Sequence, residues 1–175
     1  MEREFGRLKN EYGLTTAANA RVSSYRCVTF DPAHVAGVPF NLWAFRPSSR
    51  NRRPNEAIAE TEAQLGGRLP DDLTALLHET NGVTGEYGLG VVWPVERIAR
   101  ANVSFRASFR DVYMPFDALL FFAEAGNGDQ FAFPLTSSGV GQDVFVWDHE
   151  NDSRTWFASS LRLYLKWWLT GEHRL

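Results

Sequence analysis

The sequence has one cysteine and no long apolar run, and each absence limits what the protein can be. A single cysteine, Cys27, excludes an intrachain disulfide and any zinc cluster built on several thiolates. The longest apolar run, residues 118–123, is far shorter than the roughly 20 residues of a membrane-spanning helix. The first residues are charged where a signal peptide would be apolar, so we expect no export signal and a cytoplasmic protein.

The familiar catalytic and nucleotide-binding motifs are also missing. The chain contains no GxxxxGK phosphate loop, no GxSxG nucleophile elbow and no HExxH metal motif. Gly85, Gly88 and Gly90 have the wrong spacing for a dinucleotide fingerprint. Cys27 stands next to Val28 and is expected to be a buried, inert thiol. The sequence therefore predicts neither an enzyme nor a bound cofactor.

What the chain does contain is a divided charge. It has 175 residues, of which 44% are hydrophobic and 22% charged, typical of one soluble domain. Residues 1–55 carry nine Lys or Arg and four Asp or Glu, whereas residues 56–175 carry nine and seventeen. Nucleic-acid binders cluster basic residues, so the acidic body predicts no nucleic-acid partner, and the short apolar runs predict no membrane partner. It favours a basic protein partner, with an ordinary solubility charge as the alternative interpretation.

The chain divides into an N-terminal arm and a body. Prolines and glycines interrupt residues 1–54 without a clear period, and we expect this arm to pack partly on the body. Residues 55–175 hold the periodic segments. Helices are predicted over residues 56–65 and 70–80, ending at Gly66 and at Asn81-Gly82. A C-terminal helix is capped by Ser159 or Ser160.

Between these helices the apolar pattern changes to that of strands. Strands are predicted over residues 89–93, 118–123, 130–133, 144–147 and 154–157, with Pro134 ending the third. A short helix is expected over residues 94–102. Residues 103–110 alternate apolar and polar residues and fit a half-buried strand, while a bulged or helical course stays open. The order predicts an α+β fold: a mostly antiparallel sheet with two helices before it and one C-terminal helix packed on it.

Polar turn residues are the remaining candidates for chemistry. Asp129 follows an Asn-Gly turn. The predicted turn between the strands 144–147 and 154–157 contains Asp148, His149, Glu150 and Asp152. Carboxylates gathered at a sheet end could bind Mg²⁺ or Ca²⁺ and would support a metal-dependent hydrolase. Aspartate and asparagine are expected in tight turns in any case, so we predict no metal site.

Aromatic residues raise a second question, because six tryptophans are many for a chain of this length. Aromatic side chains that alternate with basic ones along a groove would indicate binding of single-stranded nucleic acid. Here the tryptophans lie in predicted strands with acidic neighbours or on the terminal helix. We therefore expect them to pack in the core, with one or two at an interface.

Several short motifs, taken in order, resemble one known superfamily. They are Leu65-Gly66, Leu69-Pro70-Asp71-Asp72-Leu73, Asn81-Gly82, Met114-Pro115-Phe116, the segments 119–123, 128–133 and 146–150, and Ala158-Ser159-Ser160-Leu161. Their order and spacing over residues 55–170 are similar to those of the SUKH superfamily. That superfamily contains bacterial immunity proteins and a fungal regulator of cell-wall synthesis.

The resemblance implies an α+β fold without catalytic residues. Bacterial members of the superfamily typically neutralise a cognate toxin, often a nuclease, by binding it. We accordingly expect a non-enzymatic immunity protein that occludes the surface of its toxin. The alternatives are a regulatory or scaffold module of the same fold and a metal-dependent hydrolase that uses Asp129, Asp148 and Glu150. Exposed acidic and aromatic residues in loops around the sheet are the candidate partner contacts: Glu86, Tyr87, Asp129, Asp148 and Glu150. The oligomeric state is left open.

Overall fold

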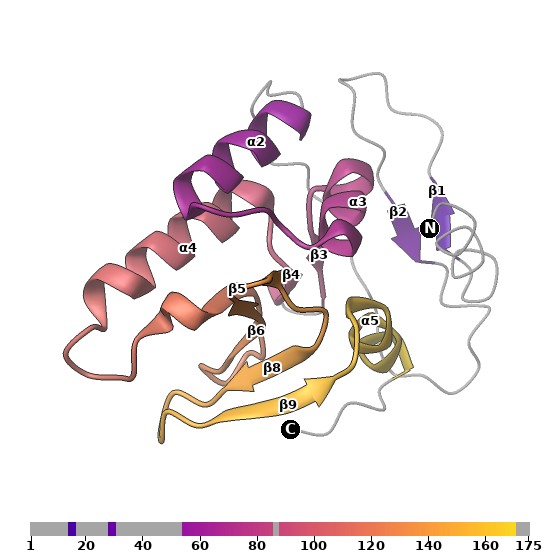
Figure 1. Ribbon diagram of the computed structural model, residues 1–175. Helices are drawn as coiled ribbons and strands as arrows, with labels where there is room; N and C mark the ends of the chain where they lie inside the picture. Colours follow the sequence, from indigo (N-terminus) through magenta and orange to yellow (C-terminus); the bar gives the residue numbers. More distant parts are fainter. Residues whose placement is uncertain (1–13, 17–27, 31–53, 86–87, 171–175) are drawn as a thin grey trace.

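The computed structural model describes residues 14–16, 28–30, 54–85 and 88–170 (Figure 1). In the N-terminal arm it contains one antiparallel pair of strands, β1 (Leu14–Thr16) and β2 (Val28–Phe30), with Thr15 opposite Thr29. Cys27 lies outside the described residues. That the arm packs on the body stays a prediction.

The two helices predicted before the sheet are confirmed. α2 (Pro54–Leu65) begins slightly earlier than expected and ends at Gly66, whose φ of +72° suits a residue without a side chain. α3 (Asp71–Thr80) ends at Asn81, which has the left-handed φ of 45°. The inward faces repeat at helical spacing and are formed by Ala57, Ile58, Thr61, Leu73, Leu76, Leu77 and Thr80.

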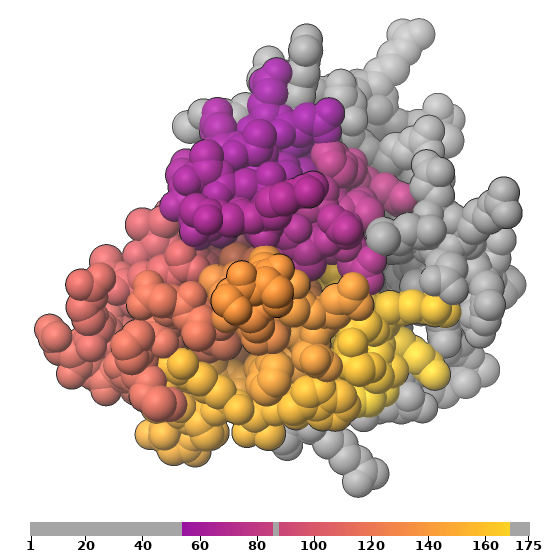
Figure 2. Space-filling view, viewed as in Figure 1, coloured from indigo at the N-terminus to yellow at the C-terminus, as the bar shows by residue number. Residues whose placement is uncertain are grey.

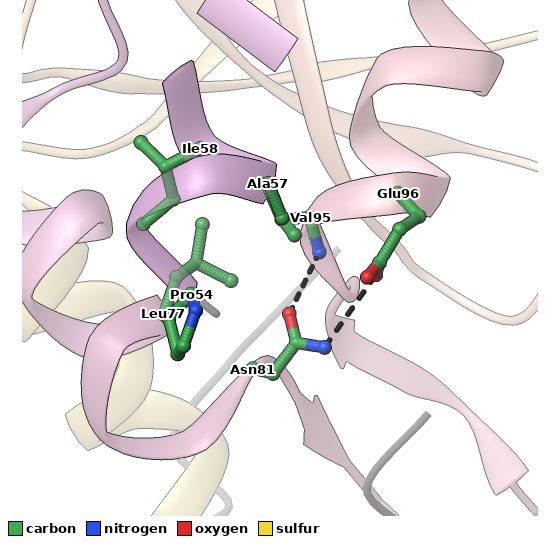
Figure 3. Close-up of a pocket in the computed structure, with 7 residues that line it drawn as sticks. All are labelled: Pro54, Ala57, Ile58, Leu77, Asn81, Val95 and Glu96. Carbon is green, nitrogen blue, oxygen red and sulfur yellow. Dashed lines mark hydrogen bonds between the residues drawn. The ribbon is translucent and has the colours of Figure 1, made fainter. Parts of the chain in front are cut away.

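The side chain of Asn81 also helps to start the next helix, which begins at Val95. Between Asn81 and that helix lie two short strands, β3 (Val83–Thr84) and β4 (Gly90–Val92), which pair antiparallel. Asn81 Oδ1 accepts a hydrogen bond of 3.0 Å from the Val95 backbone N–H, and its amide donates to Glu96 over 3.5 Å (Figure 3). The hollow between these residues and α2 has a volume of about 10 Å³, room for a single water. This region is therefore a packed seam and not a ligand site.

α4 (Val95–Ser108) corrects one prediction. Residues 103–110 were expected to form a strand, but most of them continue this helix. Its buried face, Val95, Ile98, Ala99 and Asn102, has helical spacing, and Phe105 extends the same face. The apolar and polar alternation after residue 102 is thus a coincidence of composition.

The main sheet is antiparallel throughout. A short 3₁₀ turn, η3 (Phe116–Ala118), leads into β5 (Leu119–Glu124), followed by the strands β6 (Gln130–Thr136), β7 (Gly139–Val140), β8 (Val144–Trp147) and β9 (Arg154–Ala158). The strand order is β5-β6-β8-β9, with β7 pairing the far part of β6. β5 and β9 are therefore the two edges of this sheet.

Pro134 does not end the third predicted strand, because β6 continues to Thr136. A proline cannot donate to a ladder, so it is tolerated where no donor is needed. On this side β6 pairs with β8 through residue 132 and with β7 from residue 135. Pro134 lies between the two pairings, and its carbonyl accepts from the Gly141 N–H over 2.8 Å.

Helices cover both faces of the sheet (Figure 1). α5 (Leu161–Thr170) is capped by Ser160, whose Oγ accepts from the Leu163 N–H over 3.2 Å, as predicted. It lies on one face, where the buried Tyr164 hydroxyl donates to the Val91 carbonyl over 2.8 Å. Burial raises the pKa of the Tyr164 hydroxyl well above its usual value.

Two groups of aromatic rings fill the space between sheet and helices. The α5-side cluster contains Phe122, Phe131, Phe133, Phe157, Tyr164 and Trp168. The α4-side cluster contains Phe105, Phe109, Tyr113, Phe116, Phe121 and Trp147. The fold is α+β, as predicted. Among the described helices, none has the length and apolar character needed to cross a bilayer.

Candidate functional site

Three loops meet at one end of the sheet. The β5–β6 turn (residues 125–129) and the β8–β9 turn (residues 148–153) share this end because Gln130 pairs with Trp147. The loop after α4 (residues 109–115) reaches the same place, since the Tyr113 hydroxyl donates to the His149 carbonyl over 2.9 Å. We call these three loops the turn end. In Figure 2 the end of α4 and the β8–β9 region adjoin at the lower left.

Asp129 joins the two turns. Its Oδ1 accepts from the His149 backbone N–H over 3.2 Å and lies 2.8 Å from His149 Nδ1, and its Oδ2 accepts from the Asn127 amide over 2.8 Å. Gly128 makes room for the histidine: a Cβ built there would lie 2.6 Å from His149 Cε1. The φ of Gly128, +108°, also disfavours any side chain. The glycine thus lets the imidazole lie against the neighbouring turn.

The contact shifts the pKa values of both partners. Burial alone would raise the pKa of Asp129, but hydrogen bonds from His149 and Asn127 outweigh it and hold the pKa below the usual value. The hydrogen bond to Asp129 raises the pKa of His149 above its usual value, against a smaller opposing effect of burial. The pair is therefore an ion pair in mildly acidic solution.

Asp148 organises the second turn. Its Oδ1 accepts from the Glu150 backbone N–H over 2.8 Å and its Oδ2 from the Asn151 amide over 2.7 Å. Asn151 in turn accepts from the Ser153 N–H over 2.8 Å. These are the local side-chain hydrogen bonds that favour aspartate and asparagine in turns. They leave the Glu150 side chain exposed at the tip of the turn.

Asp152 and Arg154 hold the loop after α4 against this turn. Asp152 Oδ2 accepts from the Met114 N–H and its Oδ1 from Trp147 Nε1, both over 2.7 Å. Arg154 donates to the carbonyls of Met114 over 2.7 Å and Pro115 over 3.1 Å. The turn end is therefore held in place by its own polar side chains.

Of the predicted partner contacts, the structure brings Asp129 and Asp148 together and places Glu150 beside them. Asp129 is buried and Glu150 is exposed, so only the second presents its whole carboxylate to solvent. Glu86 and Tyr87 lie outside the described residues. That any of the five contacts a partner stays a prediction.

The same residues include the one group of described side chains with metal-ligand spacing. One ligand atom each from Asp129, Asp148 and His149 lies within 4.8 Å of the others. All four carboxylate oxygens, however, already accept hydrogen bonds from the turns. The set proposed for a hydrolase differs, because it needs Glu150 in place of His149. The geometry of the turns accounts for these carboxylates without a metal.

A second hollow lies away from the turn end. It has a volume of about 160 Å³ between the start of α3, β6 and α5, and its lining includes Arg68, Asp71, Phe133 and Leu161. Pockets for small molecules usually measure about 300–1,000 Å³. This cleft is therefore too small to suggest a ligand on its own.

Sequence reasoning missed the exposed apolar residues near the turn end. Val112, Met114 and Trp156 are 68%, 54% and 51% exposed. The tryptophans Trp93, Trp147 and Trp168 are buried, as predicted for the core, whereas Trp156 stands on the surface. Aromatic content gave the expectation that one or two tryptophans are exposed, but no local pattern distinguished which.

The sequence matches a family model described as SMI1-KNR4 cell-wall, SUKH_6, over residues 55–165. The match spans α2 to the first half of α5, which is more than half of the chain. The protein therefore belongs to this SUKH family, as the order of its motifs predicted. Proteins of this kind are generally non-enzymatic immunity or regulatory domains. A search among curated proteins found no match.

Proposed function

We propose that this protein is an immunity protein that binds a cognate toxin and neutralises it by covering the toxin's active or substrate-binding surface. Membership of the SUKH family over residues 55–165 is the observation that carries the proposal. The mechanism is occlusion. It requires a surface that fits the partner and no chemical step by this chain.

Charge supports a basic partner. The acidic body would attract a toxin whose own surface is cationic, as the surface of a nuclease must be to hold a phosphate backbone. Opposite charges accelerate encounter and select the correct partner over others. At the turn end, Glu150 is exposed and Asp148 is half-buried beside it. Both are fixed on a turn that needs little further ordering when it is covered.

The direct test is co-expression with the genes encoded beside this one. One neighbour should be toxic when expressed alone, and its toxicity should disappear when this chain is present. The purified pair should elute together in size-exclusion chromatography. If no neighbouring product is toxic, or if toxicity persists although both proteins are made, the proposal is wrong.

A charge-reversed pair of variants then locates the contact. Glu150→Lys reverses an exposed charge at the turn end, and Glu79→Lys reverses a half-buried one on α3, near its C-terminus, where a cation suits the helix dipole. We expect the first to weaken the toxin complex about tenfold and the second to leave it unchanged. Equal effects would show that only overall charge matters.

The second candidate is a regulatory or scaffold module of the same fold, favoured by the words "cell-wall" in the description of the matching family. Such a module would bind a protein of its own cell and relieve no toxicity. The co-expression test separates the two. A stable complex with a non-toxic neighbour, together with no effect on any toxic one, would favour the module.

A further inference from the structure

The two edges of the main sheet differ in what covers them. At the β5 edge, the buried Asn102 side chain donates to the Phe121 carbonyl over 2.7 Å and accepts from its N–H over 2.9 Å. The Trp93 N–H donates to the Phe122 carbonyl over 2.8 Å. At the opposite edge, β9 pairs with β8 alone within the described part of the chain. An edge strand of this kind is a template for pairing with another strand.

Apolar side chains stand along the β9 edge. Trp156 is half exposed and lies opposite Phe145 on β8, which is itself half-buried. Arg154, two residues away on the same face, donates to the Met114 carbonyl and so places Met114 next to the start of the strand. Two of the four large exposed hydrophobic residues in the described part of the chain, Trp156 and Met114, therefore lie here. Grouped exposed apolar side chains are typical of interaction sites.

The edge carries few of the devices that normally block such pairing. Native edges often use lysine or proline, and β9 has neither. Its one charged residue, Arg154, is turned aside onto the carbonyls of Met114 and Pro115. Trp156 is held by a hydrogen bond of 3.1 Å from its Nε1 to Asp143 Oδ1. The indole is thus fixed in place before any partner arrives.

The surrounding charge selects the partner. Residues 109–118 and 143–156 contain six carboxylates and two arginines. One of these arginines, Arg154, is already bonded to the loop after α4. A segment that pairs with β9 would therefore meet a net negative surface, which favours lysine and arginine on that segment.

We propose that β9, with Trp156 at its centre, is the docking edge for an extended cationic segment of a partner protein, which pairs with it as an added strand. Main-chain hydrogen bonds along β9 supply affinity. An apolar side chain against Trp156 and basic side chains on the opposite face, beside Thr155, supply specificity. The inference rests on the proposed function as a binding protein and names the surface used.

The test uses the full chain and a labelled peptide of about eight residues in which lysine or arginine alternates with valine, the pattern of a half-buried strand. One control peptide has proline in place of two valines and cannot pair. A second has glutamate in place of every basic residue. Binding is measured by fluorescence anisotropy. Only the first peptide should bind, and the amides of residues 154–158 should gain protection from hydrogen exchange.

Variants of the edge sharpen the result. Trp156→Ala should weaken binding about tenfold or more, as expected for a central aromatic contact. Thr155 is exposed on β9, so Thr155→Arg should weaken binding and Thr155→Glu should strengthen it, each several-fold and less at high salt. Gln64→Arg and Gln64→Glu are the matched controls, because Gln64 is exposed on α2. They should change nothing.

Three outcomes would overturn the inference. Equal binding of the proline peptide would mean that charge alone attracts it. An unchanged affinity in Trp156→Ala would place the contact elsewhere. A dimer that dissociates in Thr155→Arg would mean that β9 pairs with a second copy of this chain. The peptide experiment tests only the docking edge at β9, whereas the co-expression experiment tests toxin neutralisation. A failure of one proposal can therefore be told apart from a failure of the other.

Discussion

The β5 and β9 edges of the same sheet differ in how the backbone groups on their outer sides are satisfied. At β5, a buried asparagine on α4 satisfies both the N–H and the C=O of Phe121, so the middle of this edge is closed to a partner strand. At β9, no strand pairs with the outer side within the described residues, and Trp156 on one face of this strand is half exposed. One edge contributes to folding, and the other is suited to recognition.

The largest expected effect breaks the covered edge. Asn102→Ala removes both partners of the Phe121 backbone, and each buried polar group left without a partner costs about 1–3 kcal/mol. We expect the free energy of unfolding to fall by about 2–5 kcal/mol, measured by urea denaturation. A loss below about 1 kcal/mol would show that water or another group satisfies this edge.

The next largest effect is expected from breaking the contact between the β5–β6 turn, next to the covered edge, and the β8–β9 turn, next to the open edge. Gly128→Ala imposes a side chain at φ +108° and displaces His149, which ties the two turns together. Gly139→Ala is the control, because its φ is +118° but no atom lies within 4 Å of the added Cβ. We expect the control to lose about 1–2 kcal/mol and Gly128→Ala about 1 kcal/mol more.

The Asp129–His149 link between these turns should depend on pH. His149 has a raised pKa, so its contribution to stability is complete below about pH 6.5 and is lost as pH rises through the folded-state value. Asp129 has a lowered pKa, so its contribution is present above 3.8 and is lost as pH falls through the folded-state value. The link is strongest between these limits.

The variant His149→Asn keeps a donor but does not titrate. Its urea midpoint should fall further below that of the natural protein at about pH 5.5 than at about pH 8.5. The difference between the two proteins cancels the contributions of the other histidines. An equal gap at both pH values would contradict the assignment.

The smallest effect on stability is expected at the open edge. Trp156→Ala removes a half-exposed ring whose hydrogen bond to Asp143 is also at the surface. The free energy of unfolding should change by about 0.5 kcal/mol or less. A loss as large as that of Asn102→Ala would mean that Trp156 is structural and that the two edges are alike.

Sequence reasoning found the elements with strong local signals. The stops at Gly66 and at Asn81 and the cap at Ser160 follow from backbone preferences that a few adjacent residues express. It mistook the second half of α4 for a strand because the alternation of apolar residues there imitates a period of two. The buried contact of Asn102 with β5, nineteen residues away, leaves no local trace that could have corrected it.

The candidate site was predictable in part for the same reason. Asp129 and Asp148 lie in turns that their neighbouring residues predict, and antiparallel pairing brings those turns to one end of the sheet. The burial of Asp129 against His149 depends on Gly128 and on the sheet register, neither of which a turn motif specifies. The exposure of Trp156 depends on which strand ends the sheet, and strand order is a property of the whole fold.

Asn81 shows how one residue can serve two elements whose demands differ. Its backbone closes α3, a task that glycine would perform as well or better. Its side chain opens α4, a task that glycine cannot perform and that aspartate would meet only by facing Glu96 with a like charge. No common replacement satisfies both neighbours. A residue whose sequence context predicts only the end of a helix is therefore among the hardest in the chain to replace.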